Sequence, residues 1–422
     1  CYIYAIMKNR TLRKQLIRKH SSSLGRILVV TGARQTGKTT LLMNSFKDHT
    51  WILLDDPVLR MQYASMTAQQ WKETFPLAIL DEIQKLPSLI ETVKAIYDTY
   101  ENTRYLLSGS SQLLLLGKVK ESLAGRCQIV ELYPLTVPEM LTSGWEDNPA
   151  SSFFQKLLSG ETTVASLGHS FLLLSDHGRR HQAFQHYLKF GGYPAIIGDD
   201  LTDQERYDWL KNYVRTYLER DIRDLAEFRN LEPFILTQQM TALHTGQTMN
   251  YSSLAREAGV TSATAKRFLT YLEISYQIIL LQPWFRNQHK RLVKSPKLHY
   301  LDIGVQQAIL QKRGGLAGNE FESAVVAEIY KQAKYLEIPT SFYHLQTLDG
   351  KEVDLLIETE KGYYAIEIKM TINAGSHDAR HLAGLSSILD KPLIASFVLS
   401  NDPVVKQLGE NITAIPVAMF LT

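Results

Sequence analysis

The feature that most constrains this chain is a glycine-rich sequence, Gly32-Ala33-Arg34-Gln35-Thr36-Gly37-Lys38-Thr39, which fits G-x-x-x-x-G-K-[ST] at every fixed position. It follows an apolar run at 26–31 that predicts a buried parallel strand, and a helical pattern comes after it. In that context glycines let backbone N–H groups curl around phosphates, and the helix N-terminus adds positive charge. The sequence therefore predicts a phosphate-binding loop rather than a glycine turn with a chance Lys-Thr pair.

Two carboxylates end a second apolar run, because 77–80 lead directly into Asp81 and Glu82. Such runs are common alone, but downstream of a phosphate loop this one is typical of a Walker B strand. We expect Thr39 and Asp81 to hold Mg²⁺, Asp81 through water, while Lys38 bridges the β- and γ-phosphates. Glu82 would act as the general base that polarises the attacking water. The ATP contacts would come from Gly32, Ala33, Arg34, Gln35, Thr36, Gly37, Lys38, Thr39 and Thr40.

Three further polar positions are candidates for the same site. Ser108, in the SGSS sequence at 108–111, either reaches toward the γ-phosphate or belongs to an ordinary turn. Arg126 either neutralises transition-state charge as a catalytic arginine finger or forms a surface salt bridge. Arg220, in LERD at 218–221, competes with Arg126 for the same role. The arginine could also come from a neighbouring subunit of a homo-oligomer.

The length of 422 residues predicts two to four domains at roughly 100–200 residues each. Strands alternate with helices in the first part, which predicts a doubly wound α/β domain with a parallel sheet. We expect a P-loop AAA-type ATPase core over 1–142, a polar insert and helical lid over 143–235, a winged helix-turn-helix over 236–312 and an α/β domain over 313–422. The part of the insert at 143–180 is Gly/Ser-rich and predicts no regular pattern.

The location of the protein follows from what the sequence lacks. No apolar run approaches the ~18 residues that span a bilayer. The two cysteines, Cys1 and Cys127, are too few for a disulfide framework, so a reducing compartment is expected. These features predict a cytoplasmic protein without a membrane partner.

A helix-turn-helix pattern lies in the middle of the chain, with a turn at Gly259 and a second helix that begins near Thr261. Its expected core residues are Phe268, Leu269 and Leu272, and its expected groove-facing residues are Ser262, Thr264, Lys266 and Arg267. The basic segment 285–297 would be the wing that binds phosphates, since no acidic residue lies between 273 and 302. DNA is therefore the expected partner, although such folds also serve packing or protein contacts.

The last part of the chain carries Glu322 on a predicted helix and Asp354 and Glu367 on adjacent predicted strands. Strand alternation places Lys369 on the same face as Glu367. We expect Glu322, Asp354 and Glu367 to bind Mg²⁺, with Lys369 activating water, as in phosphodiester hydrolysis. A half-exposed strand with Glu and Lys on its polar face is the alternative.

Seven segments together resemble, in order, a widespread group of prokaryotic AAA-type ATPases. They are GARQTGKTTLL, ILDEIQKLPSL, LLSGSSQLLL, ESLAGRCQIVELYPLT, YLKFGGYPAII, YLERDIRDL and KRLVKSPKLHYLDIGV. In that group the C-terminal part looks like a winged helix followed by a PD-(D/E)xK nuclease-like, restriction-endonuclease-like fold. The resemblance, which leaves out 143–180, implies an ATPase and assigns Glu322, Asp354, Glu367 and Lys369 to the nuclease-like motif.

Two functions remain open from the sequence. One is an ATP-hydrolysing, DNA-associated protein whose C-terminal module cleaves phosphodiesters. The other is a regulatory ATPase whose C-terminal domains only bind a partner or DNA. A weaker third possibility is a transcription regulator that recognises a defined operator.

Overall fold

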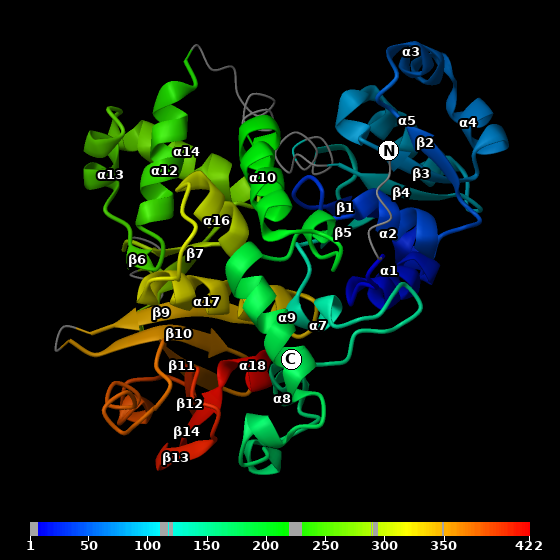
Figure 1. Ribbon diagram of the computed structural model, residues 1–422. Coiled ribbons are helices and arrows are strands. Elements are labelled where there is room, and N and C mark those ends of the chain that lie inside the picture. The colour runs from blue at the N-terminus through cyan, green and yellow to red at the C-terminus, as the bar shows by residue number, and fades with distance from the viewer. Residues whose placement is uncertain are drawn as a thin grey trace.

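The computed structural model describes residues 7–109, 117, 121–218, 230–287, 289, 294–347 and 350–422. Figure 1 shows a blue N-terminal sheet at the upper right and a yellow-to-red C-terminal sheet below, with green helices between and above them. Among the described residues, no helix is both long and apolar enough to cross a membrane.

The N-terminal sheet has five parallel strands in the order β2-β3-β4-β1-β5, which confirms the expected parallel α/β arrangement. The strands are β1 (Ile27–Thr31), β2 (Thr50–Leu53), β3 (Leu77–Asp81), β4 (Arg104–Ser108) and β5 (Cys127–Glu131). The helices of this part are α1 (Leu12–Ser21), α2 (Lys38–Ser45), α3 (Pro57–Ser65), α4 (Ala68–Thr74) and α5 (Ser88–Thr99). Separate apolar clusters pack alternate residues of β1, so both faces of the sheet are covered, as parallel strands require.

The connecting region contains α7 (Val137–Met140), α8 (Phe153–Ser159), α9 (His177–Phe190), α10 (Asp203–Tyr213) and a π-helix (Val214–Leu218). Helix α8 corrects the expectation that 143–180 has no regular pattern. Its local signals are short: a capping box joins Ser152 and Gln155, and Gly160 ends the helix in a left-handed conformation. This segment packs against the C-terminal part, where Ser170 pairs with Val404.

The next unit alternates helices with a small antiparallel sheet. Its elements are α12 (Glu232–Leu243), β6 (Gln247–Thr248), α13 (Tyr251–Glu257), α14 (Ser262–Ile274), β7 (Ile278–Pro283), β8 (Lys297–Tyr300) and α16 (Ile303–Ile309). Strand β8 pairs with both β6 and β7. Phe268, Leu269 and Leu272 are buried, which confirms the core face predicted for α14.

The C-terminal elements are α17 (Gly318–Lys334), β9 (Ser341–Gln346), β10 (Glu352–Glu358), β11 (Tyr363–Lys369), β12 (Leu393–Ser400), β13 (Lys406–Gly409), β14 (Ile412–Pro416) and α18 (Val417–Leu421). Their sheet continues into the preceding unit, because β7 pairs with β9 through Gln282 and Tyr343. The nine strands run in the order β13-β14-β12-β11-β10-β9-β7-β8-β6. The domain boundary expected between 312 and 313 lies between α16 and α17, and one sheet contains strands from both sides of it.

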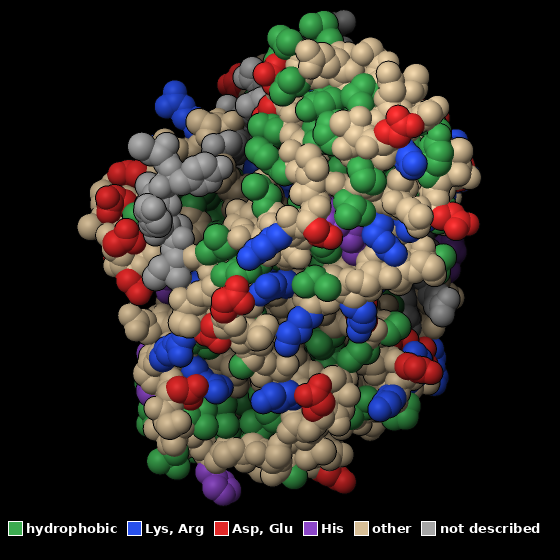
Figure 2. Space-filling model, turned by 90° about the vertical axis from the view of Figure 1, so that its right-hand side faces the viewer, with side chains coloured by type: hydrophobic (Ala, Val, Ile, Leu, Met, Phe, Trp, Pro, Cys, Tyr) green, Lys and Arg blue, Asp and Glu red, His purple; other side chains and the backbone are tan. Residues whose placement is uncertain are grey.

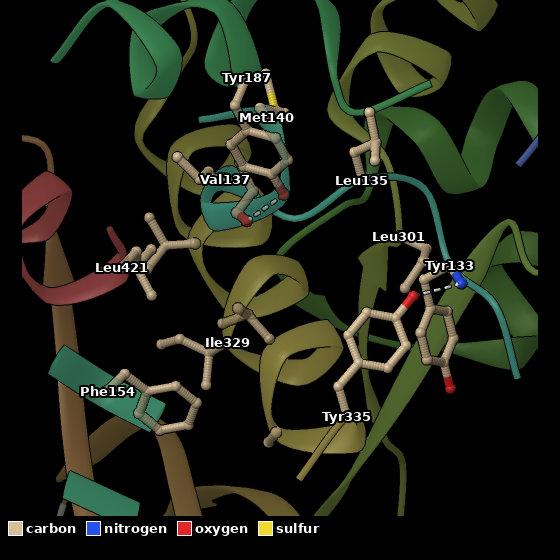
Figure 3. Packing of buried hydrophobic residues seen from close by; sticks show 14 of the residues in the cluster. Tyr133, Leu135, Val137, Met140, Phe154, Tyr187, Leu301, Ile329, Tyr335 and Leu421 are labelled. Atoms are coloured by element: carbon tan, nitrogen blue, oxygen red, sulfur yellow. Dashed lines mark hydrogen bonds between the residues drawn. The ribbon is translucent and has the colours of Figure 1, made fainter. Parts of the chain in front are cut away.

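A shared core joins the N-terminal sheet to the C-terminal part. Leu135 and Val137, on the segment that leaves β5, lie in the same cluster as Ile329 of α17 (Figure 3). The Tyr133 backbone N–H donates to the Tyr335 hydroxyl at 3.0 Å. Because these contacts are apolar and buried, the two parts form one packed body.

Candidate functional site

The glycine-rich loop connects β1 to α2 and needs glycine at two positions. Gly32 has φ +149° and lies so close to the Leu132 carbonyl oxygen that a Cβ would be 2.1 Å from it. Gly37 has φ +92° and is the last residue before α2. These backbone conformations leave the N–H groups at the start of α2 available to an anion.

Lys38 is folded into the loop that precedes it. Its ammonium group donates to the carbonyl oxygens of Gly32 and Ala33, both at 2.8 Å, and the residue is 7 % exposed. The Thr36 hydroxyl closes the same turn on Ala33 at 2.8 Å. The positive charge is thus held at the centre of the loop, where phosphate oxygens would meet it.

The Asp81 carboxylate, at the end of β3, collects hydroxyl groups from two neighbouring elements. Thr39 donates to it at 2.8 Å, and Ser108 at the end of β4 donates to its other oxygen. Strand β4 lies between β1 and β3, which is why Ser108 reaches Asp81. The hydroxyl of Thr39 and the buried carboxylate are the oxygen ligands that Mg²⁺ prefers, so this pair fits the ion.

Glu82 follows directly and adopts a left-handed backbone conformation, with φ +56°. Such a conformation is uncommon for a residue other than glycine and turns the chain sharply after β3. Its half-buried carboxylate accepts a hydrogen bond from the Gln84 side chain. The residue therefore sits at the edge of the sheet from which Thr39 and Asp81 act.

The two candidate arginines have different outcomes. Arg126 precedes β5 at the edge opposite the phosphate loop, since Cys127 pairs with Ile27 at the start of β1. Its guanidinium forms two hydrogen bonds with Asp98, at 2.7 and 3.0 Å. Arg126 therefore does not face the loop of its own chain, and Arg220 lies outside the described residues.

Arg10, which no sequence motif singles out, supports the phosphate loop from the side of the N-terminal segment. Its buried guanidinium donates to the carbonyl oxygens of Thr36 at 2.7 Å and Tyr133 at 2.6 Å, and it pairs with Glu139 at 3.2 Å. It also lies 3.3 Å from the Tyr335 hydroxyl. The loop is thereby connected to the segment after β5 and to α17. The sequence signal was weak because Arg10 lies outside any motif.

A second connection reaches the same strand from the helical unit. The Tyr276 hydroxyl lies 2.8 Å from the Thr31 hydroxyl, immediately before the phosphate loop, and 3.2 Å from the Glu131 carboxylate. Tyr276 itself has φ +61°, a left-handed conformation for a bulky residue. The end of β1 is therefore bonded directly to the residues that follow α14. Tyr213, at the end of α10, donates to the Arg34 carbonyl at 3.2 Å.

The C-terminal structure brings the four expected residues together. Asp354 and Glu367 lie on the paired strands β10 and β11, and Glu322 approaches from α17. The Lys369 ammonium is 2.8 Å from Glu367 and 3.6 Å from Asp354. The Ile368 N–H donates to the Asp354 carboxylate at 2.9 Å.

Lys297 occupies the middle of this cluster, although the sequence predicted it as part of the exposed basic segment 285–297. Its ammonium is 2.7 Å from Glu322, 3.3 Å from Asp354 and 3.4 Å from Glu352, and its side chain is 3 % exposed. The prediction was wrong for this residue because strand β8 carries it inward. Arg286 and Lys294 of the segment are exposed, while Lys290 and Arg291 lie outside the described residues.

These residues do not fit a magnesium ion. In the described part of the chain, no group of three or more His, Cys, Asp or Glu side chains is arranged to hold a metal. Burial and the Asp354 carboxylate raise the pKa of Glu322 to about 8 and that of Glu367 to about 9. Burial also acts on Asp354, but Lys297 and Lys369 hold the pKa of that carboxyl below its ordinary value. The cluster is thus organised around ammonium groups.

The polar face expected on α14 is accessible. Ser262, Lys266 and Arg267 are exposed and Thr264 is half-buried. Thr261 caps the helix by accepting from the Thr264 N–H at 3.2 Å. This places the N-terminal turn of α14 and its basic residues at the surface.

Comparison with known proteins divides the chain in three. Residues 24–141 match a family model described as an AAA domain. Residues 181–314 and 317–420 match two models that are each described as a domain of unknown function. An uncharacterized protein of Mycobacterium tuberculosis is 26 % identical over 94 % of this chain and 81 % of its own length. An uncharacterized protein of Haemophilus influenzae is 21 % identical over 92 % of this chain and 93 % of its own length.

Among solved structures, a Walker-type ATPase of Pyrococcus abyssi aligns with 73 % of this chain and 99 % of its own, at 15 % identity and a TM-score of 0.46. The geometry of the loop and of Asp81 agrees with the match over 24–141. Residues 24–141 are thus similar to an AAA domain, and they carry a phosphate-loop arrangement at the edge of their parallel sheet.

Proposed function

We propose that this protein binds ATP together with Mg²⁺ over residues 32–40 and hydrolyses it. The observation that carries the proposal is the meeting of Thr39 and Ser108 on the Asp81 carboxylate, beside a loop that holds Lys38 at its centre. This joins a cradle for phosphates to oxygen ligands for the metal at the same edge of the sheet.

The chain's own residues divide the work. Gly32, Gly37 and the first N–H groups of α2 bind phosphate oxygens, and Lys38 exchanges its carbonyl partners for the β- and γ-phosphates. Thr39 and Asp81 orient Mg²⁺, which neutralises phosphate charge when bound. Glu82 polarises the attacking water, and Ser108 keeps Asp81 in place.

The test is ATP binding and turnover in two variants of the full chain. Lys38→Ala is expected to lose ATP binding, because the only replacement for its ammonium would be water. Glu82→Gln is expected to bind ATP with Mg²⁺ normally but to hydrolyse it about 10²–10⁴-fold more slowly. Exposed Glu101→Gln is the matched control. Full turnover in Glu82→Gln would refute the assignment of the base.

We further propose that the unit from α12 to β8 contacts DNA. Its order of helix, short strand, two helices and two paired strands supports a winged helix-turn-helix, with α14 as the helix that enters the groove. Exposed Lys266 and Arg267 lie on α14, and exposed Arg286 and Lys294 lie between β7 and β8. Such basic groups bind phosphates and position the protein on the duplex.

DNA binding can be measured by fluorescence anisotropy with a labelled duplex at increasing salt. Lys266→Ala/Arg267→Ala is expected to weaken binding and to flatten the salt dependence by about one to two phosphate contacts. Lys47→Ala/Lys361→Ala removes the same charge from exposed positions elsewhere and should bind normally. Equal losses in both double variants would argue against a specific role for α14.

For the C-terminal part we favour a module that binds without cutting. The support is Lys297, whose ammonium lies among the carboxylates that cleavage would need for metal. Supercoiled, linear and single-stranded DNA should survive Mg²⁺ or Mn²⁺, with and without ATP, equally well with wild type and with Asp354→Ala/Glu367→Ala. Cleavage by wild type that disappears in this double variant would establish a nuclease instead.

A further inference from the structure

We infer that the Lys297 ammonium is a built-in cation that takes the place of a divalent metal ion in the C-terminal cluster. This makes the cluster a metal-independent anchor for the basic segment that joins β7 to β8. The inference deepens the binding role proposed for the C-terminal module. It does not depend on ATP hydrolysis or on which partner the module binds.

The distances leave no room for both cations. A divalent metal needs carboxylate oxygens at about 2.0–2.6 Å. The Lys297 ammonium already lies 2.7 Å from a Glu322 oxygen and 3.3 Å from an Asp354 oxygen. Its side chain is enclosed, so it cannot move into solvent without opening the contact between β8 and α17. An ion at this position would have to displace it.

The oxygens of Asp354 are both committed to donors from this chain. Oδ1 faces Lys297, while Oδ2 accepts from the Ile368 N–H at 2.9 Å and lies 3.6 Å from Lys369. Each of these oxygens keeps a further lone pair, but the two ammonium groups beside them repel an additional cation. Asp354 is therefore used as the link between two lysines, on β8 and on β11.

The position of Lys297 in the chain explains what the cluster anchors. It is the first residue of β8, directly after the basic segment, while Trp284 directly follows β7. The Trp284 N–H donates to the His344 carbonyl at 2.7 Å, and its indole donates to the Tyr363 hydroxyl at 3.0 Å. The residues on both sides of the basic segment are thus fixed to the C-terminal sheet, Lys297 by ion pairs and Trp284 by hydrogen bonds.

A lysine in this position gives the anchor a property that a metal would not. Its charge is covalently part of the chain, so no chelator can remove it and no divalent ion is required for assembly. Replacing Lys297 by an uncharged side chain should leave Glu322 and Asp354 facing each other without the ammonium between them, while Lys369 stays beside Asp354 and Glu367. That arrangement is the one that would acquire a metal ion.

The experiment measures Mn²⁺ binding by electron paramagnetic resonance, without nucleotide. Every chain carries Asp81→Asn, so that the nucleotide site contributes no ligand. Chains that keep Lys297 should show no Mn²⁺ site that depends on Asp354 and Glu367. Lys297→Met should gain one site with at least tenfold tighter binding, and Lys297→Met/Asp354→Asn/Glu367→Gln should lose it again.

Lys297→Arg keeps the charge and is the matched control, expected to gain no site. Because Lys297→Met removes the buried partner of Glu322 and Asp354, circular dichroism must show that this variant is folded. Mn²⁺ binding to chains that keep Lys297 tests the inference independently of that variant. A Mn²⁺ site that depends on Asp354 and Glu367 in chains with Lys297, or a folded Lys297→Met without a gained site, overturns the inference. Either result would leave the ATP and DNA measurements unaffected, so the failures are distinguishable.

Discussion

Asp81 and Asp354 are both buried carboxylates on strands, yet their partners give them different chemistry. Asp81 accepts from the hydroxyls of Thr39 and Ser108, which are neutral and can themselves bind a metal or its water. Asp354 faces the ammonium groups of Lys297 and Lys369, which compete with any metal ion. The same residue type is therefore suited to Mg²⁺ in one sheet and to an internal ion pair in the other.

The buried side chain of His20 should make the stability of the N-terminal part depend on pH. Burial, and then its neighbour His49, lower the pKa of His20 to about 4. Between pH 6.5 and 4 the folded chain therefore binds fewer protons here than the unfolded chain, so stability falls as pH falls. From pH 7 to pH 5 this residue should cost about 2 kcal/mol of unfolding free energy.

The measurement is chemical unfolding of wild type and His20→Gln at both pH values. His20→Gln should lose less stability on acidification than wild type, because it has no proton to gain at this position. His169→Gln, which changes an exposed histidine, should behave as wild type does. An identical acid loss in His20→Gln would contradict the assigned cause.

At the scale of elements, the sequence predicted those strands and loops that are marked by a short run of neighbouring residues. The strand at Leu77–Asp81 and the phosphate loop both follow from a short apolar run and glycine spacing. Helix α8 was missed because its caps lie within a polar segment. The pairing of β7 with β9 and the burial of Lys297 were missed because they depend on contacts between distant parts of the chain. Position in the sheet, rather than residue type, decides such cases.

The brace between the N-terminal segment and the phosphate loop gives an element-scale prediction. Arg10 holds the Thr36 and Tyr133 carbonyls with a planar fork, and it pairs with buried Glu139. Arg10→Lys keeps the charge but cannot reach all three partners. We expect about tenfold weaker ATP binding, since a buried hydrogen-bonded charge contributes on the order of 1.5–3 kcal/mol. Calorimetric titration would measure it.

The control for this prediction is Arg13→Lys, since Arg13 stacks on the Trp145 ring and donates to the Trp145 carbonyl at 3.2 Å. Arg13→Lys should bind ATP as wild type does. Unchanged ATP affinity in Arg10→Lys would show that the loop keeps its shape without the brace.

At the scale of the whole molecule, the shared core and Tyr276 connect the proposed nucleotide site with the helix that we propose to contact DNA. The Tyr276 hydroxyl bonds Thr31 at the end of β1, while its backbone follows the helix proposed to enter the groove. Tyr276→Phe should leave basal ATP turnover and DNA affinity unchanged but reduce the effect of DNA on turnover. Coupling between sites is typically about 1–3 kcal/mol, so a change of several-fold is measurable. The same DNA effect in Tyr276→Phe as in wild type would exclude this route.

Assembly is the last property that belongs to the whole molecule. Arg126 lies away from the loop of its own chain, so it can act in catalysis only on a neighbouring copy. Figure 2 shows hydrophobic side chains gathered at the top of one face, where α3 and β2 lie. Exposed apolar residues there are Trp51, Leu53, Val58, Leu59 and Met61. Patches of this kind commonly mark contacts between proteins.

We therefore expect specific ATPase activity to rise with protein concentration as copies associate. Arg126→Ala should lower activity at high concentration without changing ATP affinity, because the residue would act on the transition state. Mixing Arg126→Ala chains with Glu82→Gln chains tests whether the arginine is supplied in trans. The mixture should recover part of the activity, because a site on an Arg126→Ala chain has its own Glu82 and can receive Arg126 from a neighbouring Glu82→Gln chain. A specific activity that stays flat with concentration would count against an arginine supplied by a neighbouring copy.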